Sequence, residues 1–408
     1  MRVALYQDPR GGGVGGGEYV VAVLAEELRR RGHAVDYVHH QERGFAAKVA
    51  DAFGTDLSGV GERALPTNPG RWDTPDAPVW RRRAAMRGWM RDASAGYDLF
   101  VCTTHAPPPV CHAKAGVLYV LFPFFDRRAS WPWNAPGGGW AWARRRLYEA
   151  WWRERLGSYR AAAAISEFTR RWTRDYWGVD PVVIHPPVEV SDYAQAPKED
   201  RVAVVGRFTP VKRQAELVRA FAAGGPSGWA MSCVGGLGDA DADRAYFTEV
   251  EVAAAGAPVE LAVNAPRDRL RAELGRARVF WHAMGLDAPA PHLEEHFGIA
   301  TVEAMAAGCV PVVPARGGQP EIVTDGETGF LCHEIGEYAV RTAELAADPA
   351  RAARMAAAAR DAAAAFGRPM FVARMMKLLG LPPLAAVHGA PCTAASGEKS
   401  YHPGSEPA

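Results

Sequence analysis

The opening of the chain alternates strand, glycine-rich loop, helix and strand, and this order restricts the fold more than any other feature. The apolar run RVALY (2–6) predicts a buried strand, and AVDYV (34–38) predicts a second. Between them lie a glycine-rich segment and apolar residues at helical spacing, which end before Gly32, a suitable C-terminal cap. Strand, helix and strand in this order are typical of a parallel α/β sheet.

The alternation of predicted strands and helices continues and then begins a second time. Further strands of the first sheet are predicted at 97–104, 115–122, 161–166 and 181–188. After a polar, irregular stretch, new strands are predicted at 201–208, 229–236, 278–284 and 309–315, and helices at 212–224, 343–366 and 369–380. The chain therefore contains two parallel sheets in series, and ligands of such sheets bind beyond the carboxyl ends of the strands.

Domain boundaries follow from the same pattern, because 408 residues are too many for one ordinary core. We expect an N-terminal Rossmann-like domain over 1–188, a linker over 189–200 and a C-terminal Rossmann-like domain over 201–366. A C-terminal helix over 367–382 is expected to pack back on the N-terminal domain. The tail over 383–408 is rich in Gly, Pro, Ser and Ala and is expected to be disordered.

The composition narrows the class of protein. A hydrophobic content of 48% with 23% charged residues is typical of a soluble globular protein, and a net charge of +1 gives no reason to expect a nucleic-acid partner. The six cysteines are scattered without a CxxC pair, which argues against a zinc ribbon or a disulfide framework. We find neither an apolar run of about 18 residues, as a membrane span needs, nor a signal peptide. We therefore expect a cytoplasmic protein.

The first candidate binding element is the glycine-rich stretch GGGVGGGE, residues 11–18. Glycine allows close backbone approach, so successive N–H groups at a helix start can hold a phosphate. A flexible strand-to-helix turn is the alternative. No Gly-Lys-Ser/Thr follows, which excludes a Walker A loop, and only Asp36 is placed to complete a dinucleotide fingerprint.

The second candidate is VVGRFTPVKR, residues 204–213, where a predicted strand ends at Gly206. Arg207 and Lys212 follow, and lysine is rare here, with six among 47 basic residues. Two cations at the carboxyl end of a strand are suited to a diphosphate. A solvated pair of cations near a helix start is the alternative.

The third candidate is EEHFGIATVEAMAAG, residues 294–308, which reads as a loop and a helix. Glu295 precedes the predicted helix and Glu303 lies one turn inside it. A carboxylate can accept two hydrogen bonds from vicinal hydroxyls, and the helix start attracts an anion. Glu295 could then hold a sugar and Glu303 a ribose, with a diphosphate between them. An ordinary helix N-terminal acid plus a surface acid is the alternative.

Together these motifs resemble the donor site of retaining glycosyltransferases of family four, which have the GT-B fold of two Rossmann-like domains facing each other across a cleft. The paired glutamates of the family match Glu295 and Glu303, and its diphosphate-binding cations match Arg207 and Lys212. Its glycine loop matches 15–17. The segment WHAMGL before EEHFG looks closest to the branch with the eukaryotic dolichol-linked α-1,2-mannosyltransferase and its bacterial relatives.

The resemblance implies transfer of a sugar from a nucleoside diphosphate sugar to a hydroxyl, with retained configuration and without a metal or other cofactor. The donor would bind the C-terminal domain, and a small-molecule, glycan or lipid-linked acceptor the N-terminal domain. Arg207, Lys212 and Glu295 would be catalytic. The implied donor-binding residues are Gly16, Gly17, Arg207, Lys212, Glu295, Phe297, Gly298, Ile299 and Glu303. The acids of DADAD (239–243) are interpreted as a loop rather than a metal motif.

The resemblance favours GDP-mannose slightly as donor and leaves the acceptor open. The Ala- and Arg-rich composition suggests a high-GC bacterium, where polysaccharide and natural-product pathways both use such enzymes. Many family members carry a histidine where this chain has Leu121 or Phe122. In a same-face mechanism the departing phosphate can take the acceptor proton, so the histidine is not essential. His105 and Asp126 are candidates on the acceptor side, and each also has a structural interpretation.

Arginine and tryptophan are concentrated in residues 127–177. Eight of the 13 Trp lie there, and 11 Arg face only three acids over 127–174. This mixture suits peripheral contact with anionic lipid at the inner face of a membrane, where a lipid-linked acceptor would lie. Two alternatives explain the same composition: the segment binds a soluble anionic acceptor, or it forms a solvated basic face over a Trp-filled core.

Two other classes of protein fit part of the pattern. A Rossmann-type NAD(P)-dependent oxidoreductase would use the glycine-rich loop but leaves Arg207, Lys212 and the two glutamates unexplained. A noncatalytic nucleotide-sugar-binding protein would use the same site without transfer. Affinity for NAD(P) against UDP or GDP separates the first class from a glycosyltransferase, and transfer or donor hydrolysis separates the second.

Overall fold

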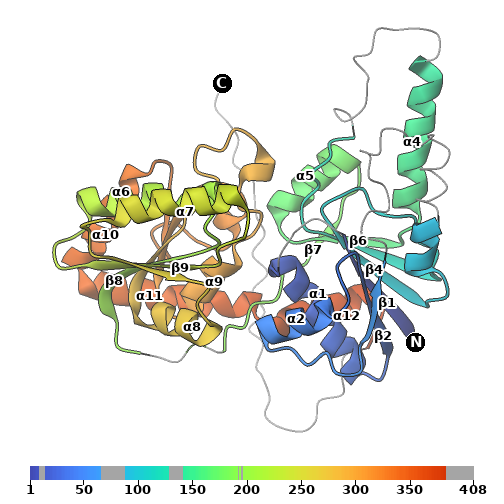
Figure 1. Ribbon diagram of the computed structural model, residues 1–408, viewed down its shortest axis with the longest axis horizontal. Helices are drawn as coiled ribbons and strands as arrows, with labels where there is room; N and C mark the ends of the chain where they lie inside the picture. The colour runs from blue at the N-terminus through green and yellow to red at the C-terminus, as the bar shows by residue number, and fades with distance from the viewer. Residues whose placement is uncertain (9–13, 66–87, 128–140, 192, 194–195, 383–408) are drawn as a thin grey trace.

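The computed structural model describes residues 1–8, 14–65, 88–127, 141–191, 193 and 196–382. Two α/β domains lie side by side, one coloured blue to green and the other yellow to orange (Figure 1). The tail over 383–408, for which we expect disorder, lies outside the described residues.

The N-terminal sheet is parallel, and its strands are ordered β3-β2-β1-β4-β5-β6-β7. Its strands are β1 (Arg2–Gln7), β2 (Ala34–His39), β3 (Gly61–Ala64), β4 (Leu99–Thr104), β5 (Ala115–Val120), β6 (Ala161–Ala164) and β7 (Val182–Val183). All but β3 were predicted as apolar runs. The edge strand β3 has the sequence GERA, which contains no apolar run to reveal it.

The C-terminal sheet is also parallel, with the order β10-β9-β8-β11-β12-β13. Its strands are β8 (Glu199–Val205), β9 (Ala230–Gly235), β10 (Val259–Val263), β11 (Ala277–Trp281), β12 (Val310–Pro314) and β13 (Phe330–Cys332). Strands β8 and β11 are central neighbours, so the loops that follow them meet at one edge of the sheet. This edge carries the second and third candidate motifs.

Helices cover both faces of each sheet (Figure 1). The N-terminal domain contains α1 (Gly16–Arg30), α2 (Phe45–Phe53), α4 (Ala141–Gly157) and α5 (Glu167–Trp177). The C-terminal part contains α6 (Gln214–Gly224), α7 (Asp241–Ala254), α8 (Arg267–Arg276), α9 (Ile299–Ala306), α10 (Gly336–Ala347), α11 (Pro349–Ala363), α12 (Arg368–Leu379) and the 3₁₀ turns η1 (Pro210–Lys212), η2 (Pro291–Leu293), η3 (Gln319–Glu321) and η4 (Ala364–Phe366).

Two of the helical expectations were wrong in detail. The stretch 343–366 is not one helix, because Asp348 caps a new helix by accepting a hydrogen bond from the N–H of Arg351, with Pro349 in its first turn. The stretch 239–243 is not only a loop, because α7 begins at Asp241, where acids favour a helix start.

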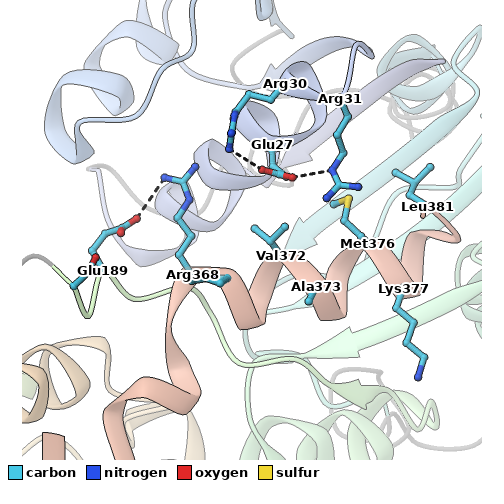
Figure 2. A pocket seen from close by; sticks show the side chains of 12 residues that line it. Glu27, Arg30, Arg31, Glu189, Arg368, Val372, Ala373, Met376, Lys377 and Leu381 are labelled. Carbon is cyan, nitrogen blue, oxygen red and sulfur yellow. Dashed lines mark hydrogen bonds and ion pairs between the residues drawn. The ribbon is translucent and has the colours of Figure 1, made fainter. Parts of the chain in front are cut away.

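Helix α12 returns to the N-terminal domain and packs beside α1. Arg368, at its start, pairs with Glu26 of α1 at 2.9 Å and with Glu189 at 3.4 Å. A pocket of about 700 Å³ lies between these helices (Figure 2). Its α1 residues, Glu27 and Arg30, belong to the last turns of that helix. At 1.5 Å per residue they lie roughly 15–20 Å from the glycine-rich start of α1, so this pocket is distinct from the candidate site.

Candidate functional site

A partly buried ion pair joins the two C-terminal motifs. Lys212 lies in η1 after β8, and its Nζ donates to Glu295 Oε2 at 2.6 Å. His282, directly after β11, places Nε2 2.9 Å from the same oxygen. The three side chains therefore converge at the carboxyl ends of neighbouring central strands, where open α/β sheets bind ligands.

The charges of this cluster are fixed by its surroundings. Burial alone would raise the pKa of Glu295, but the ammonium of Lys212 and the contact with His282 outweigh it and hold that pKa well below its ordinary value. Burial lowers the pKa of His282. At neutral pH the cluster consists of a carboxylate, an ammonium and a neutral imidazole.

Arg207 has a fixed backbone and an exposed side chain. Its carbonyl accepts a hydrogen bond from Gln214 Nε2 at 2.7 Å, and the next residue, Phe208, donates its N–H to the carbonyl of Gly236 at 2.8 Å. Among the described residues, no carboxylate forms an ion pair with its guanidinium. Arg207 is therefore free to bind an anion, whereas Lys212 is already paired.

The start of α9 requires glycine. Gly298 has φ +117°, and a Cβ there would lie 2.8 Å from Gln319 Nε2. The N–H groups of Ile299 and Ala300 have no acceptor within the helix, whereas that of Thr301 donates to the carbonyl of Gly298 at 3.0 Å. The side chain of Phe297 is buried against His185 and Phe366, so only its backbone is available to a ligand.

Glu303, which the sequence analysis predicts to hold the ribose of the donor, is buried in α9. Its Oε1 lies 3.4 Å from Nη2 of Arg267 at the start of α8, and its side chain is 11% exposed. Burial raises the pKa of Glu303, and the positive charge of Arg267 opposes this without cancelling it. Sequence reasoning missed Arg267 and His282, because a lone Arg or His near an element end gives no signal of its own.

The glycine-rich turn is held by a buried network. Glu18 Oε2 accepts the N–H of Gly15 at 2.9 Å, and its Oε1 accepts from Gln7 Nε2 at 2.7 Å. Gln7 Oε1 in turn accepts from Tyr37 Oη at 2.7 Å. Residues 9–13 lie outside the described part of the chain. Asp36 accepts a hydrogen bond from Tyr97 Oη at 2.6 Å, so the acid needed for a dinucleotide fingerprint is already engaged.

The two domains meet at the glycines. A Cβ on Gly16 would lie 2.8 Å from Cδ1 of Ile299, the first residue of α9. A Cβ on Gly17 would lie 2.9 Å from Leu121 Cδ1. The structure therefore brings Gly16, Gly17 and the start of α9 together, with Leu121 packed beneath the turn.

The two acceptor-side candidates have different aromatic neighbours in the structure. The ring of His105 lies 5.0 Å from that of Phe124 and 6.5 Å from that of His296, so it faces the other domain. Asp126 lies near Tyr148 of α4 and Tyr176 of α5. Burial raises the pKa of both tyrosines, and the negative charge of Asp126 raises it further. His105 thus borders the candidate site.

Contacts across the junction include helix caps that the sequence did not reveal. Ser166 Oγ donates to the carbonyl of His296 at 2.6 Å. Glu321, from the C-terminal domain, accepts the N–H groups of Glu167 and Phe168 at 2.7 and 2.8 Å and so caps α5 of the N-terminal domain. A cap supplied from more than 150 residues away has no local sequence signature.

The Arg- and Trp-rich segment divides into core and surface. Trp152 and Trp177 are buried, whereas Trp142 and Leu147 of α4 are 64% and 63% exposed. The guanidinium of Arg146 lies 4.7 Å from the centroid of the Trp142 ring. Residues 128–140 of this segment lie outside the described residues. Within the described chain, no helix is both long and apolar enough to cross a bilayer.

Family models match both halves of the chain. A Glycosyltransferase Family 4 model matches residues 14–192, and a Glycosyl transferases group 1 model matches residues 189–362. Two parallel-sheet Rossmann-like domains that meet at these motifs define the GT-B class. The chain belongs to the family-four glycosyltransferases of this class, as the motifs predicted.

Curated relatives agree with this assignment. The GDP-Man:Man(3)GlcNAc(2)-PP-Dol alpha-1,2-mannosyltransferase of Dictyostelium discoideum is 28% identical over 252 residues, which cover 55% of this chain and 48% of the relative. A D-inositol 3-phosphate glycosyltransferase of Mycobacterium marinum is 34% identical over 209 residues, 45% of this chain and 41% of the relative. The matches thus span less than half the length of these relatives.

Solved structures confirm the predicted fold. HepE of Anabaena, crystallised with UDP and glucose, superposes with a TM-score of 0.67 at 17% identity and covers 92% of this chain and 99% of its own. WaaG, a glycosyltransferase involved in lipopolysaccharide biosynthesis, superposes with a TM-score of 0.62 at 14% identity and covers 93% and 100%.

Proposed function

We propose that the protein is a retaining, metal-independent glycosyltransferase that uses a nucleoside diphosphate sugar. The observation that carries the proposal is the pairing of Lys212 with Glu295 directly before the start of α9, with Glu303 one turn inside that helix. Arg207, Lys212 and the first-turn N–H groups would bind the diphosphate, Glu295 the sugar and Glu303 the ribose. Membership of the family supports this assignment.

The proposed step needs no protein base. The acceptor oxygen forms a bond to the anomeric carbon, and the bond from that carbon to the diphosphate oxygen breaks on the same face. The acceptor proton passes to the departing diphosphate oxygen, whose negative charge Arg207 and Lys212 stabilise. Electrostatic stabilisation of the leaving group is thus the main contribution of the protein.

The proposed function is tested by transfer itself. Incubation with UDP-glucose, GDP-mannose and their dTDP and ADP counterparts, together with a panel of octyl hexosides, should yield a product from at least one pair. NMR of the new anomeric proton should show the configuration of the donor, and excess EDTA should leave the rate unchanged. An inverted product, or a rate abolished by EDTA and restored by a divalent metal, would contradict the proposal.

Donor affinity should fall at acid pH because of Glu303. A carboxylate must be ionised to accept both ribose hydrogen bonds, and burial raises the pKa of Glu303 above its ordinary value. As pH falls through that raised value, protonation removes one acceptor, whereas Glu295 stays ionised because its pKa is lowered. Calorimetric titration of the preferred nucleotide from pH 8 to 4.5 should show this loss in the wild type. A Glu303→Gln variant should give a weak, flat profile, and a flat wild-type profile would contradict the role of Glu303.

We further propose that α4 makes peripheral contact with an anionic membrane that carries the acceptor. Its exposed Trp142 and Leu147 lie with Arg146 on a helix at the outer edge of the N-terminal domain (Figure 1). Vesicles with anionic phosphatidylglycerol should co-sediment the protein, and neutral phosphatidylcholine vesicles should not. A Trp142→Ser, Leu147→Ser double variant should stay in solution. Equal sedimentation of the variant and the wild type would contradict this surface.

A further inference from the structure

His296 belongs to the donor loop, but its ring is held by the other domain. It lies parallel to the ring of Phe122, with centroids 4.0 Å apart and planes at 7°. The centroid of the Phe168 ring lies 6.3 Å from that of His296, with planes at 15°, and Phe124 lies edge-on at 5.9 Å. Because three aromatic rings of the N-terminal domain surround it, the imidazole has a defined orientation in the junction.

One nitrogen of this ring has no partner. Nε2 is buried and makes no hydrogen bond with any of the described residues. The backbone of His292 hydrogen-bonds the ring, but burial and the nearby charges of His105 and Lys212 outweigh that contact and lower the pKa of His296 to about 3. The imidazole is therefore neutral at working pH. Buried polar atoms are nearly always satisfied in native proteins, so an orphan nitrogen in a ligand site calls for an explanation.

The position of His296 indicates what would satisfy this nitrogen. The residue follows Glu295, which is proposed to bind the donor sugar, and its ring faces the domain that would hold the acceptor. His105 of that domain lies 6.5 Å away, ring to ring. The residue as a whole is only partly buried, although Nε2 itself is buried.

We propose that Nε2 of His296 is a substrate contact, which accepts a hydrogen bond from the acceptor hydroxyl that attacks the sugar. This inference rests on the proposed function. The imidazole positions the hydroxyl and does not take its proton, since so weak a base cannot compete with the departing diphosphate. The contact comes from the donor domain, and the His296 ring lies against Phe122. The family resemblance predicted a histidine of the N-terminal domain at Leu121 or Phe122.

Two variants distinguish the effect of the Nε2 hydrogen-bond acceptor from the effect of the aromatic ring. His296→Phe keeps the aromatic stack and removes the nitrogen, whereas His296→Gln restores a hydrogen-bond acceptor near Nε2. We expect His296→Phe to lower both sugar transfer and hydrolysis of the donor by water about 100-fold and to raise acceptor KM. Affinities for the free nucleoside diphosphate and for the intact nucleotide sugar should stay within about twofold, and His296→Gln should recover part of the rate.

The outcomes are distinguishable. If His296→Phe turns over like the wild type, the ring serves packing and the inference is wrong. If affinity for the nucleotide sugar falls but that for the free diphosphate does not, Nε2 binds a hydroxyl of the donor sugar, which also overturns it. Failure of the proposed function would appear in the wild type, which would neither bind nor cleave any nucleotide sugar. An unchanged melting temperature in His296→Phe confirms that the variant is folded.

Discussion

Replacing Lys212 with alanine is expected to reduce turnover by about 10²–10³-fold, the usual effect of removing one group that stabilises developing charge. Lys212 would lose its contact with the departing diphosphate. Glu295 would also lose the partner that lies 2.6 Å away. Burial would then raise the pKa of Glu295, so the carboxylate that holds the sugar would be lost at higher pH than in the wild type.

The measurement is steady-state turnover together with nucleotide affinity. Lys114→Ala is a matched control, because Lys114 pairs with Asp98 at 2.8 Å but is 82% exposed on the N-terminal domain. That control should behave like the wild type, since exposed ion pairs contribute little. Turnover within threefold of the wild type in Lys212→Ala would refute its catalytic role.

Replacing Glu303 with alanine is expected to weaken nucleotide binding by about 10- to 100-fold, which corresponds to the loss of hydrogen bonds to one charged group. The change removes both acceptors for the ribose and leaves Arg267 without its carboxylate partner. Turnover at saturating donor should fall much less, because the ribose lies away from the bond that breaks.

Calorimetric titration with the preferred nucleoside diphosphate checks this prediction. Glu344→Ala in α10 is the control, since it also removes a carboxylate paired with arginine, at 2.9 Å from Arg341. Its nucleotide affinity should match that of the wild type. Wild-type affinity in Glu303→Ala would place the ribose elsewhere.

Much of the fold could be predicted because parallel strands buried on both faces are continuous apolar runs. The polar edge strand β3 could not, since half-exposed strands lack that run. Parts of the candidate donor site could be predicted from the sequence where the backbone requires glycine. Gly298 must adopt a positive φ, Gly16 must let Ile299 of the other domain approach, and Gly17 must let Leu121 of its own domain approach.

The remaining site residues depend on contacts between distant segments. Arg267 is 36 residues from Glu303, and Glu321 caps a helix 153 and 154 residues earlier in the chain. His296 lies inside the motif that the sequence analysis quoted, but its proposed role depends on the orientation that Phe122 of the other domain gives its ring. No local pattern encodes such a pairing.

The central claim is that a nucleoside diphosphate sugar binds at the start of α9. A thermal-shift panel of UDP, GDP, dTDP and ADP sugars, with NAD and NADP included, tests it most directly, because a ligand that binds the folded state raises the melting temperature. We predict that at least one nucleotide sugar stabilises the wild type, that Glu303→Ala loses most of this shift, and that neither NAD nor NADP has an effect. Stabilisation by NAD or NADP alone would contradict the account.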